Sequence, residues 1–147
     1  MAKSLLSQQA EEFINKGVYL ELYASNMYLH LSNHCQRIGY FGAAKFFKDE
    51  SKDELEHYQK HADFMNDMGS VANIPSVPSM QEDFGYLQNL KDAITSAYET
   101  EFELFKQYSK MYQDCNDPVV KQFLLQFLDR KSTRLNSSHL GISYAVF

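Results

Sequence analysis

Acidic and histidine side chains lie on a stripe of residues 41–68 where apolar residues would be expected. Steps of three and four residues along this segment pass through Ala43, Phe47, Glu50, Glu54, His57, His61, Phe64 and Met68. A helix that packs on a core keeps such a stripe apolar, because a buried ionisable group is costly unless it is paired or bound to a metal. Glu54 and His57 are three residues apart and therefore point to the same side of a helix. This stripe indicates either a buried metal site or a solvated helix face, and acids from other helices are needed to decide between them.

Two other segments each offer one acid from a similar stripe. Glu21 is the single acid on the stripe of a helix expected from about residue 7 to 35, and Glu101 is the single acid on that of a helix expected up to about residue 115. Glu99 falls off the stripe and is expected to be solvated, although the choice between Glu99 and Glu101 as a ligand stays open. A Glu-x-x-His pair with acids from facing helices is typical of di-iron carboxylate bundles. Carboxylate and imidazole ligands suit iron better than a thiolate-preferring metal.

The segments that would position these side chains read as four helices. Helices are expected over about 7–35 and 41–68, and Gly69 ends the second. Ser79 and Glu82 have the spacing of a capping box for the third, and Asp117 before Pro118 reads as the N-cap of the fourth. The links are short, long and short, and the extended 69–80 segment can span the length of a helix. The fold class is therefore all-α, a four-helix bundle with one long crossover.

Composition limits the possible functions. At 147 residues the chain is one domain by length, and its net charge of −5 without a basic cluster excludes nucleic acid as a partner. No apolar run reaches the ~20 residues of a membrane span, and no secretory signal is recognised. The cysteines, Cys35 and Cys115, are isolated and expected to be buried thiols in a reducing compartment. A cytoplasmic protein is expected.

Three motifs resemble those of the non-haem ferritins, in the same order and on the expected helices. They are LELYAS at 20–25 followed by Tyr28 and Leu29, DELEH at 53–57, and YETE at 98–101. The resemblance covers about residues 5–128. It implies a ferritin-like four-helix bundle, with an iron pair bound as Fe2+ or Fe3+ at a di-iron centre.

The resemblance also implies roles for single residues. Glu21, Glu54 and His57 would form the first iron site, Glu54 would be shared, and Glu101 would bind the second iron. Tyr28 matches a tyrosine beside the site that hydrogen-bonds near the ligands and can donate electrons; an ordinary core aromatic is the alternative.

Four further polar residues of the second helix are not matched ligands. His61 and Glu50 are interpreted as supporting the site or the fold. Asp53 and Glu56 resemble acids of accessory iron binding, with a solvated helix face as the alternative.

By the same resemblance, the full-length parent would be a ferroxidase. It would oxidise Fe(II) with dioxygen or peroxide and store the Fe(III) mineral inside a cage of many copies. The alternatives are a di-iron oxidase or peroxidase of the rubrerythrin or bacterioferritin type, and a non-catalytic storage subunit.

The last segment of the chain reads differently from the rest. After Leu128 no helical stripe is recognised, and residues 129–147 resemble the translation of a widely used short-read sequencing adapter, with Leu140 and Gly141 at the position of its index. We therefore expect a ferritin-like bundle over 1–128, truncated in its fourth helix, and a non-native tail over 129–147. The native fourth-helix ligands and a fifth helix would be missing.

Overall fold

Four long helices and one short helix make up the described part of the protein. The computed structural model describes the backbone of residues 3–146 and the side chains of residues 3–135. The helices are α1 (Gln8–Arg37), α2 (Phe41–Asp67), α3 (Met80–Phe84), α4 (Leu90–Asp114) and α5 (Pro118–Val146). No strand occurs in the described backbone. The all-α prediction is confirmed.

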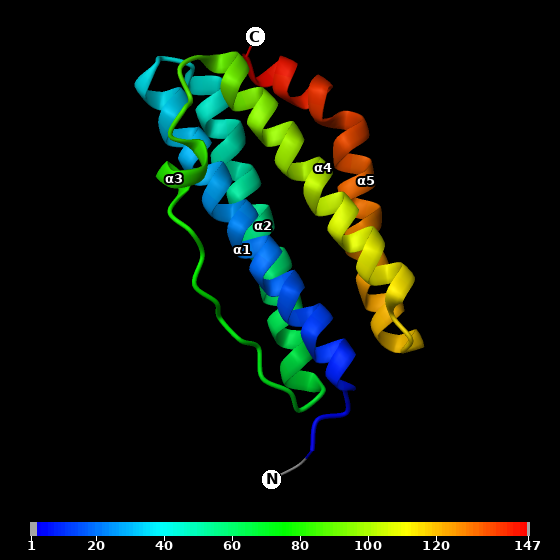
Figure 1. Cartoon of the computed structure of the whole chain (residues 1–147). Helices are drawn as coiled ribbons and strands as arrows, with labels where there is room; N and C mark the ends of the chain where they lie inside the picture. The colour runs from blue at the N-terminus through cyan, green and yellow to red at the C-terminus, as the bar shows by residue number, and fades with distance from the viewer. Residues whose placement is uncertain (1–2, 147) are drawn as a thin grey trace.

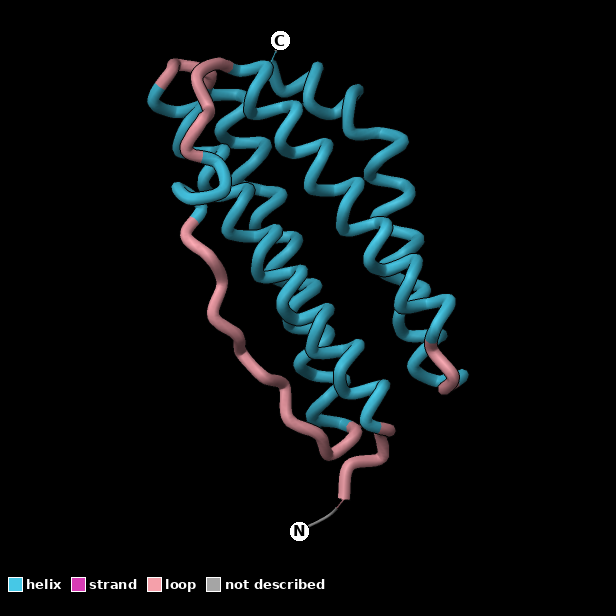
Figure 2. Tube along the Cα trace, in the orientation of Figure 1, coloured by secondary structure: helices cyan, strands magenta, loops and turns pink. Residues whose placement is uncertain are grey.

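The long helices pair as the short links require. α1 packs against α2 and α4, and α5 packs against α4 and α2, so the four form a bundle (Figure 1). Gly39 and Gly69 end α1 and α2 with positive φ angles of 87° and 71°, a conformation that glycine adopts without steric cost. The segment between α2 and α3 runs back along the outside of the bundle as an extended loop (Figure 2), which is the predicted crossover.

The predicted third helix is divided in two. α3 ends after one turn at Gly85, and α4 starts at Leu90. The prediction of a Ser79 capping box is wrong, because the Ser79 side chain makes no capping hydrogen bond. Asn89 instead caps α4, because its side-chain oxygen accepts a hydrogen bond from the Asp92 N–H. Asparagine is one of the preferred residues at the N-cap position.

The fourth long helix begins as predicted and continues farther than expected. The Asp117 carboxylate accepts hydrogen bonds from the N–H groups of Val119 and Val120. The expectation that the helical stripe ends at Leu128 is wrong, because α5 continues to Val146. The buried stripe of α5 continues past Leu128 but becomes charged there. Its buried side chains follow steps of four and three residues through Val120, Leu124, Phe127 and Lys131. The assignment of 129–147 to a non-native tail stays a prediction.

The core consists of two clusters of buried side chains with a charged centre between them. The first core cluster joins α1, α2, α4 and α5 and contains Ile14, Leu20, Met65, Leu104, Tyr108, Leu124 and Phe127 among others. The second core cluster joins α1, α2, α3 and α4 and contains Met27, Tyr28, Leu31, Cys35, Phe47, Phe84 and Ala97 among others. None of the described helix segments is long and apolar enough to cross a bilayer.

Candidate metal centre

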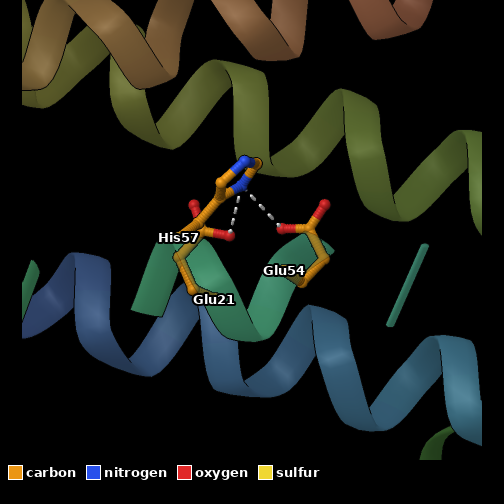
Figure 3. Close-up of side chains that lie close together, drawn as sticks. All are labelled: Glu21, Glu54 and His57. Atoms are coloured by element: carbon orange, nitrogen blue, oxygen red, sulfur yellow. Dashed lines mark ion pairs between the residues drawn. The ribbon is translucent and has the colours of Figure 1, made fainter. Parts of the chain in front are cut away.

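Glu21 of α1 and Glu54 and His57 of α2 converge in the middle of the bundle. Each offers one ligand atom, and these atoms lie within 4.8 Å of one another. His57 Nδ1 is 3.5 Å from Glu21 Oε2 and 3.5 Å from Glu54 Oε2, with the ring directed between the two carboxylates (Figure 3). All three side chains are at most 2% exposed. The three predicted first-site residues therefore lie together, and their role as metal ligands stays a prediction.

Glu101 of α4 faces the same centre, whereas Glu99 does not. Glu101 is 1% exposed, and Glu99 is exposed on the outer side of α4. The Tyr28 hydroxyl donates to Glu101 Oε1 at 2.6 Å. Burial first, and then the Glu101 charge, hold the pKa of Tyr28 well above its usual value. Tyr28 therefore stays protonated and fixes one oxygen of Glu101.

A lysine that the sequence interpretation set aside lies among the acids. Lys131 of α5 is fully buried, and its Nζ is 2.8 Å from Glu54 Oε2, 3.4 Å from Glu21 Oε2 and 3.8 Å from Glu101 Oε2. The sequence carried a signal for this position, because Lys131 continues the spacing of Leu124 and Phe127. It was missed because residues 129–147 were assigned to a tail.

Arg134, one turn farther along α5, contacts a second group of acids. Its Nε is 3.2 Å from Glu50 Oε2 and its Nη1 is 3.3 Å from Glu101 Oε1. The guanidinium also contacts Glu54 Oε1 and, at 3.9 Å, the exposed Asp53. Glu54 therefore presents one oxygen to Lys131 and the other to Arg134.

Arg130 fixes the outer nitrogen of His57. Its Nη1 is 2.8 Å from His57 Nε2. Because a guanidinium can only donate, Nε2 of His57 accepts, which leaves Nδ1 facing the carboxylates.

The electrostatics of the centre keep Glu21 ionised. Burial acts to raise the pKa of Glu21, but Lys131, the His57 ring and His61 oppose it and bring the pKa to about 2. Glu21 is therefore a carboxylate at neutral pH, the form in which it can bind a cation.

Tyr108 and His61 connect Glu21 to the first core cluster. The Tyr108 hydroxyl donates to Glu21 Oε1 at 2.8 Å and lies 3.0 Å from His61 Nε2. The His61 Nδ1 is 2.7 Å from the backbone oxygen of His57 and must donate to it. His61 thus contacts the residues around the centre, and its interpretation as a supporting residue stays a prediction. The contact of Tyr108 was missed because an aromatic residue on the stripe of α4 reads as ordinary core.

Gly17 makes room for this arrangement on α1. A Cβ atom at residue 17 would lie 2.4 Å from His61 Nε2 and 3.2 Å from the Tyr108 hydroxyl oxygen. The His61 ring cannot move away easily, because the Phe127 ring is centred 4.2 Å from it and the Phe123 ring 5.2 Å.

A cavity of about 520 Å³ connects the centre with the surface. Acidic residues from three helices line it, namely Glu50, Asp53, Glu56, Glu101 and Asp129. Asp53 and Glu56 are exposed at its mouth, which agrees with accessory cation binding and equally with a solvated face.

The comparison with known protein families decides the family. The ferritin-like domain matches residues 11–137. The chain belongs to the ferritin family. The predicted resemblance to non-haem ferritins is therefore confirmed.

Individual relatives are similar over different shares of the chain. A ferritin of Pacifastacus leniusculus is 37% identical over 133 residues, covering 88% of this chain and 62% of its own length. A probable bacterial non-heme ferritin-like protein of Haemophilus influenzae is 32% identical over 97 residues, covering 66% of this chain and 57% of its own length. The chain thus spans about three fifths of the length of these two relatives.

Solved structures share the fold at low identity. The ferritin of Chlorobium tepidum has a TM-score of 0.83 at 21% identity, covering 96% of this chain and 85% of that one. An open pore ferritin of Archaeoglobus fulgidus has a TM-score of 0.81 at 19% identity, covering 94% of this chain and 85% of that one.

Proposed function

We propose that this chain derives from an iron-storage ferritin that binds iron(II) at the buried carboxylate centre and oxidises it with dioxygen or peroxide. The ferric product would be kept inside a shell of many copies, in the cytoplasm. The observation that carries the proposal is the convergence of Glu21, Glu54 and His57, whose ligand atoms lie within 4.8 Å of one another. Iron is the substrate in this proposal, and the metal itself supplies the redox chemistry.

Two buried atoms support cation binding at the centre. His57 Nδ1 and Glu101 Oε2 have no hydrogen-bond partner, although buried polar groups are normally satisfied. Glu101 Oε2 is an atom of the type that binds iron. His57 Nδ1 becomes one once Arg130 releases Nε2, because the single proton of the neutral ring can then move from Nδ1 to Nε2. A cation at the centre would give both atoms a closer partner than the Lys131 ammonium, which lies 3.8 Å from Glu101 Oε2.

The contacts of Glu54 support a pair of cations. Its Oε2 faces Lys131 and its Oε1 faces Arg134. One carboxylate therefore serves two positive groups at once, which is what a ligand shared between two iron ions must do. Tyr28 would hold Glu101 in place for the second ion and could supply an electron to the reaction.

A non-catalytic storage subunit is the second candidate, because Lys131 and Arg134 fill the centre of this chain with positive charge. Iron(II) has to displace both before it can be oxidised there.

Aerobic oxidation of iron(II), followed by the absorbance of the ferric product, tests the proposal. The full chain and the Lys131→Ala/Arg134→Ala variant are compared, each with and without Glu54→Ala. We expect oxidation well above that in buffer in at least the double variant, and its loss on adding Glu54→Ala. The exposed Glu103 of α4 provides the matched control, since Glu103→Ala should change nothing. Rates equal to those of the Glu54→Ala chains would reject the ferroxidase and favour the storage subunit.

A further inference from the structure

The positive side chains of α5 and the acids of the other helices form one closed ion cluster. Lys131 lies within 4 Å of Glu21, Glu54 and Glu101. Arg134 lies within 4 Å of Glu50 and Glu101 and contacts Glu54. A fully buried lysine is rare unless it is paired, and here every acid of the centre shares in the pairing. The cluster is therefore a specific arrangement and not a surface contact.

We propose that Lys131 and Arg134 form an intramolecular cationic plug, which occupies the two positions that a pair of divalent cations would take. The Lys131 ammonium lies between the acids that converge with His57. The Arg134 guanidinium lies between Glu50, Glu54 and Glu101, on the other side of the shared carboxylate. Plug and metal use the same oxygens, so they exclude each other. This inference rests on the proposed cation site but not on any oxidation there.

Arg130 extends the plug to the imidazole ligand. His57 Nε2 accepts a hydrogen bond from the Arg130 guanidinium. Arg130, Lys131 and Arg134, three of the five residues 130–134, therefore contact side chains of the centre. Divalent cations must detach this turn of α5, whereas the apolar part of the helix up to Phe127 has its own anchorage in the core. Metal binding is thereby coupled to local opening of α5 after Leu128.

The plug also offsets the repulsion among the buried acids. Several carboxylates in one low-dielectric site repel one another, and two cations within 4 Å offset that repulsion. The plug lies entirely within 129–147, the segment whose non-native origin remains a prediction. It is a property of this chain, whatever the origin of the segment.

Anaerobic titration with Co(II), followed by its visible absorption and by calorimetry, tests the plug. The full chain is compared with Lys131→Ala/Arg134→Ala and with the charge-matched control Lys106→Ala/Lys110→Ala, which removes two exposed lysines of α4. We expect Co(II) to bind at least about tenfold more tightly to the plug variant, equivalent to about 1.4 kcal/mol, and the control to bind like the full chain. Circular dichroism verifies that each variant is folded.

Backbone hydrogen exchange gives a second measurement. It would not change if Lys131 and Arg134 merely weakened Co(II) binding by their charge, without local opening of α5. In the full chain, Co(II) should speed the exchange of the backbone amides of 130–135 and leave those of 120–127 unchanged. Lys131→Arg keeps the charge and should keep the weak binding.

The outcomes separate the plug from the proposed function. Equal Co(II) affinity of the full chain and the plug variant, without faster exchange in 130–135, would overturn the plug while leaving the metal centre intact. No Co(II) binding by the plug variant would overturn both. Tight binding by the variant without oxidation of iron(II) would support the plug and reject only the ferroxidase.

Discussion

The two core clusters differ in how α5 takes part in them. In the first core cluster α5 contributes apolar side chains, Val120, Leu124 and Phe127, which are fully buried. In the second core cluster the described part of α5 contributes none. Between the clusters the same helix presents Lys131 and Arg134 to the acids.

This difference indicates two kinds of attachment within one helix. Apolar burial is non-directional, and no dissolved ion competes for the apolar side chains that make it. Ion pairs in a buried site depend on partners that a metal ion can also bind, and their net contribution to stability is small or uncertain because both charges lose hydration. We expect the apolar residues of α5 up to Phe127 to keep the helix attached under all conditions. We expect the charged turn with Lys131 and Arg134 to stay attached only while no metal ion binds the acids.

The strongest test of the comparison is Phe127→Ala. The Phe127 ring is fully buried against His61, Phe123 and Tyr108, and its truncation should lower the free energy of unfolding by about 3–5 kcal/mol. Urea unfolding followed by circular dichroism measures the change. Phe102, 44% exposed on α4, is the control, and Phe102→Ala should cost about 0.5 kcal/mol or less. Similar losses for both variants would contradict an apolar anchorage of α5.

Gly17→Ala examines the tight packing beside that anchor. The new Cβ would meet the His61 ring at 2.4 Å, so we expect a loss of about 1–3 kcal/mol from overpacking. In a His61→Ala background the same change should instead stabilise the helix by up to ~1 kcal/mol. Urea unfolding of the four chains in the double-mutant cycle gives both numbers. If Gly17→Ala changed the free energy of unfolding equally in both backgrounds, the His61 ring would not be the group that the new Cβ meets.

Tyr108→Phe probes the polar link between the first core cluster and the charged centre. Removing the hydroxyl leaves Glu21 Oε1 and His61 Nε2 without this partner, and a loss of about 1–3 kcal/mol is expected for unsatisfied buried groups. The exposed Tyr40 supplies the control, since Tyr40→Phe should leave the urea midpoint unchanged. A midpoint for Tyr108→Phe equal to that of Tyr40→Phe would mean that the link contributes nothing to stability.

The smallest effect concerns Cys35 in the second core cluster. Burial raises the pKa of its thiol to about 11, so at pH 8 it should react with iodoacetamide far more slowly in the folded chain than in urea. Because the folded pKa lies above the unfolded value of 9.0, stability from this group is intact below pH 9 and lost as the pH rises towards 11. A Cys115→Ser chain followed by mass spectrometry isolates the reaction. Equal rates in the folded and unfolded chains would indicate that this end of the bundle opens readily.

Much of the architecture could be predicted from local chemistry. The caps at Ser7 and Asp117, the glycine stops and the crossover length depend on residues close in sequence. Asn89 took the role expected of Ser79: both residues can cap a helix, but the chain leaves the helix at Gly85 and the long helix starts only at Leu90. A capping pattern alone does not choose between two competent residues.

The sequence by itself determined the fold class and the family, and its helical spacing placed Glu54 and His57 on one face of a helix. That Glu21 joins them from another helix was implied by the resemblance to the ferritin motifs. Only the tertiary structure decided which cations neutralise those acids and which tyrosine bonds to Glu21. Lys131 and Tyr108 are 110 and 87 residues away from Glu21 along the chain. Contacts across such separations depend on the packing and rotation of whole helices against one another, which no local pattern encodes.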